Sequence, residues 1–158
     1  MTNGNNTGVE LENRVKLWAY KKFKVTDSAT RYFVNGLSVT KPFEVDVWIK
    51  IPTGLFGWST TNVWIECKDR KASIKRGDVF NLVSKAKDVY QAVRKGKQDL
   101  YFDKLMIVTT SRYDTDAIAL ANQEGVACYL YDGGKYLLFN DWDWDNEPKW
   151  LRDVKTAS

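Results

Sequence analysis

The sequence predicts a single α/β domain in which a mixed β-sheet lies between layers of helices. Strand-like and helix-like segments alternate along most of the chain, which is typical of such layered folds. A nearly continuous apolar run over residues 104–111 indicates a central strand covered on both faces. The 158 residues suffice for one hydrophobic core, and neither an internal repeat nor an interdomain linker divides them.

The first half of the chain predicts one helix followed by strands joined by hairpins. Residues 1–7 are polar and indicate a flexible N-terminus, whereas apolar residues at helical spacing predict a helix over 8–22. Asn35-Gly36 stands between apolar flanks, which indicates a β-hairpin turn. Residues 52–62 contain glycines and a proline and predict the tip of a second hairpin around Phe56.

The strand that begins near residue 43 alternates, so we expect its side chains on two faces. One face carries Phe43, Val45, Val47 and Ile49, and the other carries Glu44, Asp46 and Trp48. The segment "VWIECK" predicts the returning strand over residues 63–68.

The second half predicts two helices and two further strands. A helix over 78–95 has an apolar face opposite a lysine-rich one. After the central strand, a helix over 114–124 closes at Gly125, and 126–132 predicts another strand. Residues 141–158 are expected to form an acidic, tryptophan-rich tail at the surface.

Composition narrows the chemistry. The chain has no histidine, which excludes His-dependent nucleophile triads and His acid–base catalysis. With 2 cysteines, a Cys/His zinc site is disfavoured as well. Catalysis would then depend on carboxylates, Lys, Tyr, Ser or a hard metal ion bound by oxygen. The net charge of +4 favours a polyanionic partner only mildly.

The cysteines and the lengths of the apolar runs indicate the cellular setting. Cys67 and Cys128 lie within apolar runs, so we expect buried thiols and a reducing, cytoplasmic environment. No apolar run approaches the roughly 20 residues of a membrane-spanning helix, and residues 1–8 do not resemble a secretion signal. We therefore expect no membrane association.

One acidic cluster stands out by its context. Four carboxylate-x-lysine triplets occur, and the one at 66–68 ends an apolar strand that follows a strand carrying an aspartate. In a hairpin around Phe56, Asp46 and Glu66 are equidistant from the tip, so they would meet on adjacent strands. Side chains two apart on a strand point the same way, so Lys68 would lie beside Glu66.

This arrangement resembles the PD-(D/E)xK nucleases, which include restriction endonucleases, Mrr-like enzymes and Holliday junction resolvases. Asp46 and then Glu66-Cys67-Lys68 match the motif, and "GVELENRV" is similar to the first-helix segment whose glutamate faces the site. Glu12 is the best match to that glutamate and Glu10 the second. The proline that usually precedes the aspartate is Val45 here.

The resemblance implies a restriction endonuclease-like three-layer α/β/α fold over residues 8–140 and Mg²⁺-dependent hydrolysis of DNA, with Mn²⁺ as a substitute. Asp46, Glu66 and the Cys67 backbone carbonyl would bind the metal, and Glu12 would bind a second ion or a metal-bound water. Lys68 would orient the attacking water or offset negative charge. The predicted phosphate contacts are Arg70, Lys71, Lys75 and Arg76. A domain of this size reaches both DNA strands most easily as a homodimer.

Other interpretations remain open. Glu66 and Lys68 could form a solvated ion pair at a strand end, and the basic residues a solvated surface. Trp48, Trp58 and Trp64 could stack on exposed bases, although core or hairpin packing is favoured. The chain could also be a catalytically silent nucleic-acid-binding or assembly subunit with this fold. A third possibility is a small-molecule enzyme on an unrelated α/β fold, although no glycine-rich phosphate loop follows a predicted strand, so nothing indicates nucleotide binding.

Overall fold

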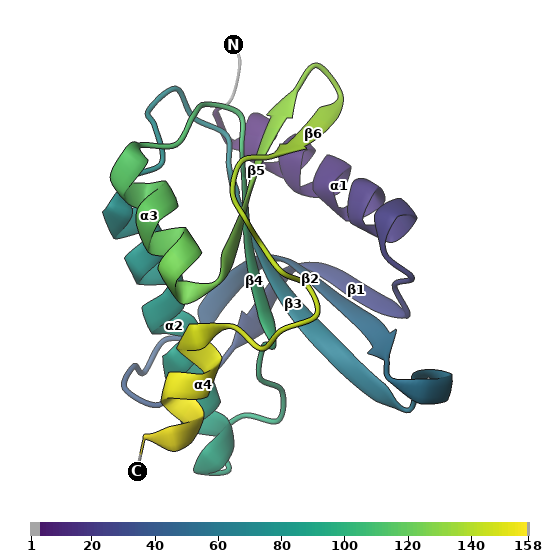
Figure 1. Cartoon of the computed structure of the whole chain (residues 1–158), viewed down its shortest axis with the longest axis vertical. Coiled ribbons are helices and arrows are strands. Elements are labelled where there is room, and N and C mark those ends of the chain that lie inside the picture. Colours follow the sequence, from purple (N-terminus) through teal and green to yellow (C-terminus); the bar gives the residue numbers. More distant parts are fainter. Residues whose placement is uncertain (1–3, 158) are drawn as a thin grey trace.

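The computed structural model describes residues 4–157, which build a six-stranded sheet with helices on both faces (Figure 1). The elements follow along the chain as α1 (Gly4–Lys22), β1 (Asp27–Val34), β2 (Phe43–Thr53), the short 3-10 helix η1 (Leu55–Gly57), β3 (Ser59–Lys68), α2 (Arg76–Arg94), β4 (Lys104–Thr109), α3 (Thr115–Glu124), β5 (Val126–Asp132), β6 (Lys135–Leu138) and α4 (Lys149–Thr156).

The strands lie in the sheet in the same order as in the chain, but their directions change. β1, β2 and β3 form an antiparallel meander, β3, β4 and β5 run parallel, and β6 returns antiparallel to β5. Parallel neighbours need a crossover between them, which α2 and α3 provide. The predicted α/β fold with a mixed sheet between helical layers is therefore confirmed.

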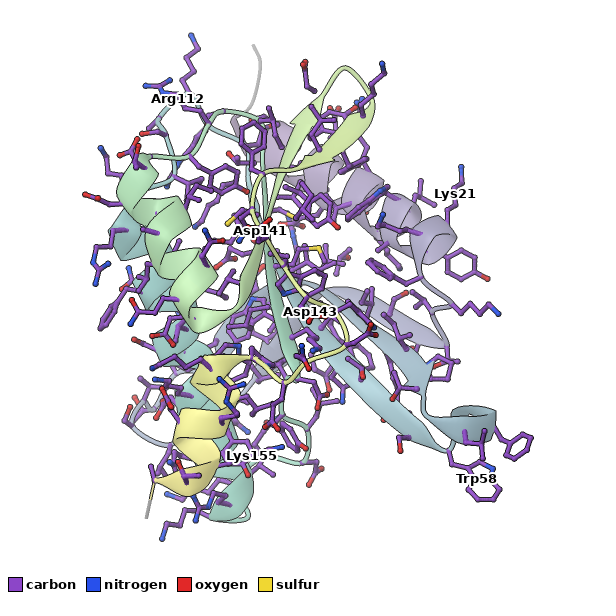
Figure 2. The ribbon with its side chains drawn as sticks, viewed as in Figure 1. Lys21, Trp58, Arg112, Asp141, Asp143 and Lys155 are labelled. Atoms are coloured by element: carbon purple, nitrogen blue, oxygen red, sulfur yellow. The ribbon has the colours of Figure 1, made fainter. Side chains whose placement is uncertain are left out.

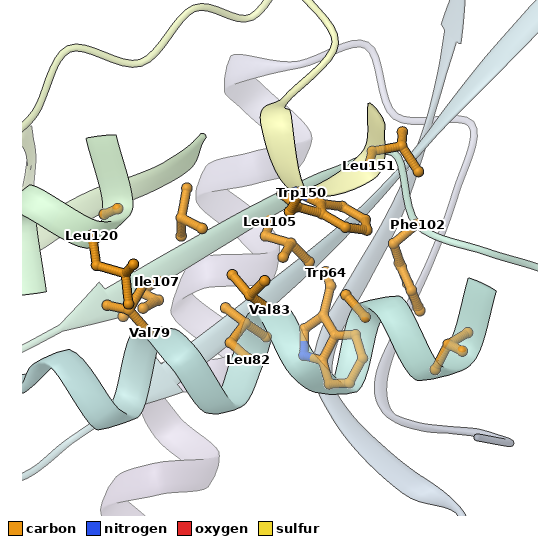
Figure 3. Close-up of a cluster of buried hydrophobic side chains, with 14 of the residues drawn as sticks. Trp64, Val79, Leu82, Val83, Phe102, Leu105, Ile107, Leu120, Trp150 and Leu151 are labelled. Atoms are coloured by element: carbon orange, nitrogen blue, oxygen red, sulfur yellow. The ribbon is translucent and has the colours of Figure 1, made fainter. Parts of the chain in front are cut away.

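The helices divide into two layers (Figure 1). α1 packs on one face of the sheet through Leu11, Val15 and Ala19. α2, α3 and α4 cover the other face, where Trp64 and Leu105 lie among helical side chains (Figure 3). All residues of β4 are buried, as its continuous apolar sequence predicts for a strand covered on both faces.

Two predicted helix ends have clear local causes. α2 begins where the Asp78 carboxylate accepts the backbone N–H of Lys75 at 2.8 Å, which satisfies a donor at the helix start. α3 ends at Gly125, whose φ of 86° is costly for any other residue. A Cβ at Gly125 would also lie 2.6 Å from the Pro148 side chain, so this glycine also permits the close approach of the segment before α4.

The start of the chain and the first hairpin differ from expectation. α1 begins at Gly4, so residues 4–7 are helical and not a flexible lead-in, while residues 1–3 lie outside the described part. β1 and β2 pair as predicted, but a loop over residues 35–42 joins them in place of a tight Asn35-Gly36 turn. This loop is held on α2, where Asp88 accepts the N–H groups of Leu37 (3.3 Å) and Ser38 (3.0 Å).

The C-terminal segment is not a surface tail throughout. α4 buries Trp150, Leu151 and Val154 in the core shared with α2 and α3. Before it, Trp144 stacks on Phe23 at a centroid distance of 4.9 Å, which ties the acidic stretch to the end of α1. Residues on both sides of the predicted boundary at residue 140 therefore belong to one packed unit.

The expected face alternation of β2 fails at Asp46. Phe43 and Val45 pack toward α2, whereas Val47 and Ile49 pack toward α1, so the alternation changes phase between them. On β1 the facing residue is Arg31, which has a φ of 53°. The ladder pairs Thr30 with Val47 and Tyr32 with Val45, but Arg31 and Asp46 do not pair. A local backbone irregularity thus turns Asp46 out of the regular strand pattern.

Two further expectations concern the membrane and the thiols. No helix in residues 4–157 is long and apolar enough to cross a bilayer. Cys67 and Cys128 are both free; Cys128 is buried, as expected, whereas Cys67 is partly buried. Of the three tryptophans considered for base stacking, Trp48 and Trp64 are buried in the core, but Trp58 is 86% exposed. It lies at the far end of the β2–β3 hairpin (Figure 2).

Candidate functional site

The β2–β3 hairpin brings Asp46 and Glu66 together. Its pairs run from Thr53 with Ser59 at the tip to Val47 with Ile65, and Asp46 and Glu66 are the next residues outward. The predicted register around Phe56 is therefore confirmed. On its other side, β3 continues parallel to β4, and this pairing holds Glu66 beside Ile107 at the centre of the sheet.

Asp46 is fixed by a hydrogen bond to the neighbouring strand. Its Oδ2 accepts the backbone N–H of Cys67 at 2.8 Å, next to Glu66. The β2–β3 ladder ends just before this point, so the carboxylate satisfies an amide that has left the regular pairing. The irregularity at Asp46 thus has a structural result: it directs an acidic side chain at the strand that carries Glu66.

Glu66 is the most perturbed carboxyl group of the cluster. Burial comes first among the causes that raise its pKa to about 8, followed by the hydrogen bond and the negative charge of Asp46. The positive charges of Lys68 and Lys85 act in the opposite direction. Without a further cation, the pair therefore keeps a proton near neutral pH, because two adjacent carboxylates repel one another when both are ionised.

Glu12 reaches the same region from α1. Its side chain is only 12% exposed, and its Oε2 accepts a hydrogen bond from Arg31 Nε at 3.3 Å. Burial and the charge of Asp46 raise the pKa of Glu12, whereas Arg31 lowers it. Glu10 is exposed and is not among these groups, so Glu12 is the glutamate of α1 that lies near Asp46.

Lys68 and Cys67 complete the motif at the end of β3. Lys68 is partly buried, and its backbone carbonyl accepts the Thr109 hydroxyl at 3.0 Å and the Thr110 N–H at 3.2 Å, which anchors the strand end to β4. Burial raises the pKa of the Cys67 thiol well above its usual value, and the nearby carboxylates act in the same direction. The thiol is therefore neutral and unsuited to nucleophilic chemistry.

The residues fit a hard divalent cation in part. Over residues 8–157, no three Asp, Glu, Cys or His side chains are grouped closely enough to hold a metal ion. Asp46 and Glu66 offer two carboxylates, and Glu12 is bound to Arg31. Mg²⁺ commonly uses one or two carboxylates and completes its shell with waters and substrate phosphate, so this pair meets its basic requirement.

The four predicted phosphate contacts divide into two groups. The Arg70 guanidinium forms an ion pair with Asp78 at the start of α2, and Lys75 Nζ lies 3.6 Å from Asp114. Lys71 and Arg76 are exposed. Within the part of the chain that the structure describes, these two form no ion pair, so they are the better placed to bind an external anion.

Two residues of this region carry no signal in the sequence. Lys85 of α2 acts electrostatically on Glu66, and a lysine on the polar face of a predicted helix gives no sign of that proximity. Arg31 contacts Glu12 and sits at a positive φ, which no sequence pattern around it indicates. The proximity of Lys85 and Arg31 to the acidic residues is visible only in the folded structure.

Comparisons with known proteins support the fold and leave the chemistry open. No protein-family profile matches the sequence, and no curated protein matches it. A solved structure described as "Crystal Structure of Protein of Unknown Function AF1548" aligns with a TM-score of 0.56 and 17% identity, over 81% of this chain and 61% of that one. The chain thus spans about three fifths of that protein's length, and the likeness shows a shared α/β fold.

Proposed function

We propose that the chain is a metal-dependent endonuclease that hydrolyses phosphodiester bonds in DNA. The observation that carries this proposal is the placement of Asp46 and Glu66 side by side on neighbouring strands, with Lys68 following on the same strand. That is the order and spacing of the PD-(D/E)xK pattern. A carboxylate pair that raises a pKa to about 8 also reduces stability, which is typical of a functional site.

Each residue has a defined part in this proposal. Asp46 and Glu66 would bind Mg²⁺ or Mn²⁺, with the Cys67 carbonyl as a further ligand. A bound ion would polarise the scissile phosphate and acidify a water molecule. Glu66 would release its proton on metal binding, since a cation stabilises the ionised form. Lys68, whose charge already acts on Glu66, would orient the attacking water or stabilise the negative charge that develops on the phosphate.

A silent nucleic-acid-binding subunit is the second candidate, and one observation favours it. Glu12 is paired with Arg31, and the cluster offers two carboxylates where some metal sites have three. Such a subunit would bind DNA without cutting it. A homodimer and a reducing, cytoplasmic setting are parts of the proposal under either function.

Cleavage assays separate the two candidates. Supercoiled, linear, single-stranded and four-way-junction DNA would be incubated with Mg²⁺, Mn²⁺ or EDTA. We expect metal-dependent cutting that falls by about 100-fold or more in Asp46→Asn, Glu66→Gln and Lys68→Ala, because each removes a group that stabilises the transition state. Lys149→Gln on α4 changes the net charge by the same amount as Lys68→Ala and should cut normally. DNA binding without cutting by the folded wild type would establish the silent subunit.

A further inference from the structure

We infer that Arg31 acts as a built-in cation that takes the place of a second metal ion beside Glu12, so that the site holds one divalent ion. This inference rests on the proposed function, because it concerns the metal stoichiometry of the same site. It makes Arg31 a positioning residue for Glu12 and assigns Asp46 and Glu66, without Glu12, to the metal.

The backbone conformation of Arg31 indicates that the fold holds this residue in a defined position. Its φ of 53° lies in the left-handed region, which is unfavourable for a non-glycine residue within a strand. The β1–β2 ladder is regular on both sides of it and skips only Arg31 and the facing Asp46. Residues held in such conformations cluster at functional sites, where surrounding contacts compensate for the strain.

Its contacts supply that compensation. Arg31 Nε lies 3.3 Å from Glu12 Oε2 and 4.0 Å from Glu44 Oε1, so one guanidinium neutralises carboxylates from α1 and from β2. Asp46 lies near enough to raise the pKa of Glu12 by its charge. The guanidinium therefore already neutralises the Glu12 carboxylate that a second cation would bind.

The charge balance of the site follows from this contact. A metal ion bound to Glu12 would have to displace Arg31 or share the carboxylate with it, and two cations at that separation repel. The Arg31 side chain is itself 52% exposed, so an anion from solution could reach it. A fixed cation next to a single metal ion suits a phosphate substrate that carries its own negative charge.

Manganese binding tests the inference without reference to cleavage. Isothermal titration with Mn²⁺ should give one bound ion for each wild-type chain and two for each Arg31→Gln chain. The second ion in Arg31→Gln should bind at least about tenfold more tightly than any additional ion that wild type binds weakly. Arg31→Lys retains the charge and should keep one ion. Glu12→Gln combined with Arg31→Gln should lose the second ion again. Lys149→Gln, which removes a distant charge on α4, should match wild type.

The outcomes separate this inference from the proposed function. If wild type and Arg31→Gln bind the same number of ions, and Glu66→Gln abolishes that binding, the inference is wrong and the metal site stands. Two ions in wild type would also overturn it. If neither folded wild type nor folded Arg31→Gln binds Mn²⁺, both the inference and the proposed metal site fail.

Discussion

Glu66 couples the candidate site to the stability of the fold. An unfolded glutamate ionises near pH 4.3, whereas burial and Asp46 raise the pKa of Glu66 to about 8 in the folded chain. Between these values the folded state holds a proton that the unfolded state has lost. Stability should therefore fall as pH rises through this window, and the loss should be complete above pH 8.

We predict that thermal melts in EDTA show this loss between about pH 5 and pH 8 and that Glu66→Gln removes it, since the amide does not titrate. For a chain of this size, each kcal/mol corresponds to about 2–4 °C in Tm. Mg²⁺ should restore wild-type stability at pH 8 and have little effect on Glu66→Gln. Asp132→Asn, at an exposed position, is the control. An unchanged pH dependence in Glu66→Gln would show that Glu66 ionises normally.

We expect Arg70 to stabilise the fold more than it contributes to binding of the substrate. Its guanidinium is paired with Asp78, whose carboxylate also accepts the Lys75 amide at the start of α2. Burial opposes ionisation of Asp78, but the Lys75 amide and Arg70 together hold its pKa below the usual value. Arg70→Ala should lower the free energy of unfolding by about 1–2 kcal/mol in urea titrations. Lys71→Ala, at an exposed neighbour, should leave it unchanged, and equal effects would contradict this assignment.

The β2–β3 hairpin shows how far sequence reasoning reaches. Its register was predictable because turn-forming residues define the tip and apolar strands extend from both sides, which places Asp46 opposite Glu66. The phase change at Asp46 was not predictable. It coincides with the positive φ of the facing Arg31, whose side chain contacts Glu12 and Glu44 from other parts of the chain. Local patterns carry no information on such long-range ion pairs.

α4 is an element that the sequence did not predict. Its apolar residues Trp150, Leu151 and Val154 do fall on one helical face, but the short helix follows an acidic stretch that is typical of a surface tail. The packing depends on Gly125, which admits Pro148 and so brings α4 onto α2 and α3. A contact between the end of one helix and the start of another cannot be inferred from either segment alone.

Removing the large side chain of α4 should therefore destabilise the whole domain. Trp150 is fully buried, and Trp150→Ala should lower the free energy of unfolding by about 3–5 kcal/mol, through lost burial and the cavity left behind. Trp58→Ala is the matched control, because Trp58 is 86% exposed and the change should cost less than about 0.5 kcal/mol. Urea titrations measure both. A small effect at Trp150 would show that α4 contributes little to the folded state.

The distribution of charge over the molecule limits how DNA could approach. Arg112 lies at one end of the view in Figure 2 and Lys155 at the other, with Asp141 and Asp143 between them. If the chain binds DNA as proposed, the negatively charged segment that leads to α4 would repel the polyanion. A backbone bridge between Ile74 and Tyr113 holds the loops after β3 and β4 together at the end with Arg112.

We predict that DNA binding depends on salt through these loops. With Glu66→Gln as a non-cutting background, the slope of log K against log salt should shrink by about 1 for each phosphate contact removed, as in Lys71→Ala and Arg76→Ala. Lys75→Ala should change it less, because Lys75 is shared with Asp114. Fluorescence anisotropy at several salt concentrations measures these slopes. Lys95→Ala is the charge control, because Lys95 is exposed and lies at the far end of α2 from Arg76. If Lys95→Ala lowers the slope as much as Lys71→Ala does, the DNA surface is not at the end of β3, and the metal cluster and the DNA-binding face would have to be assigned separately.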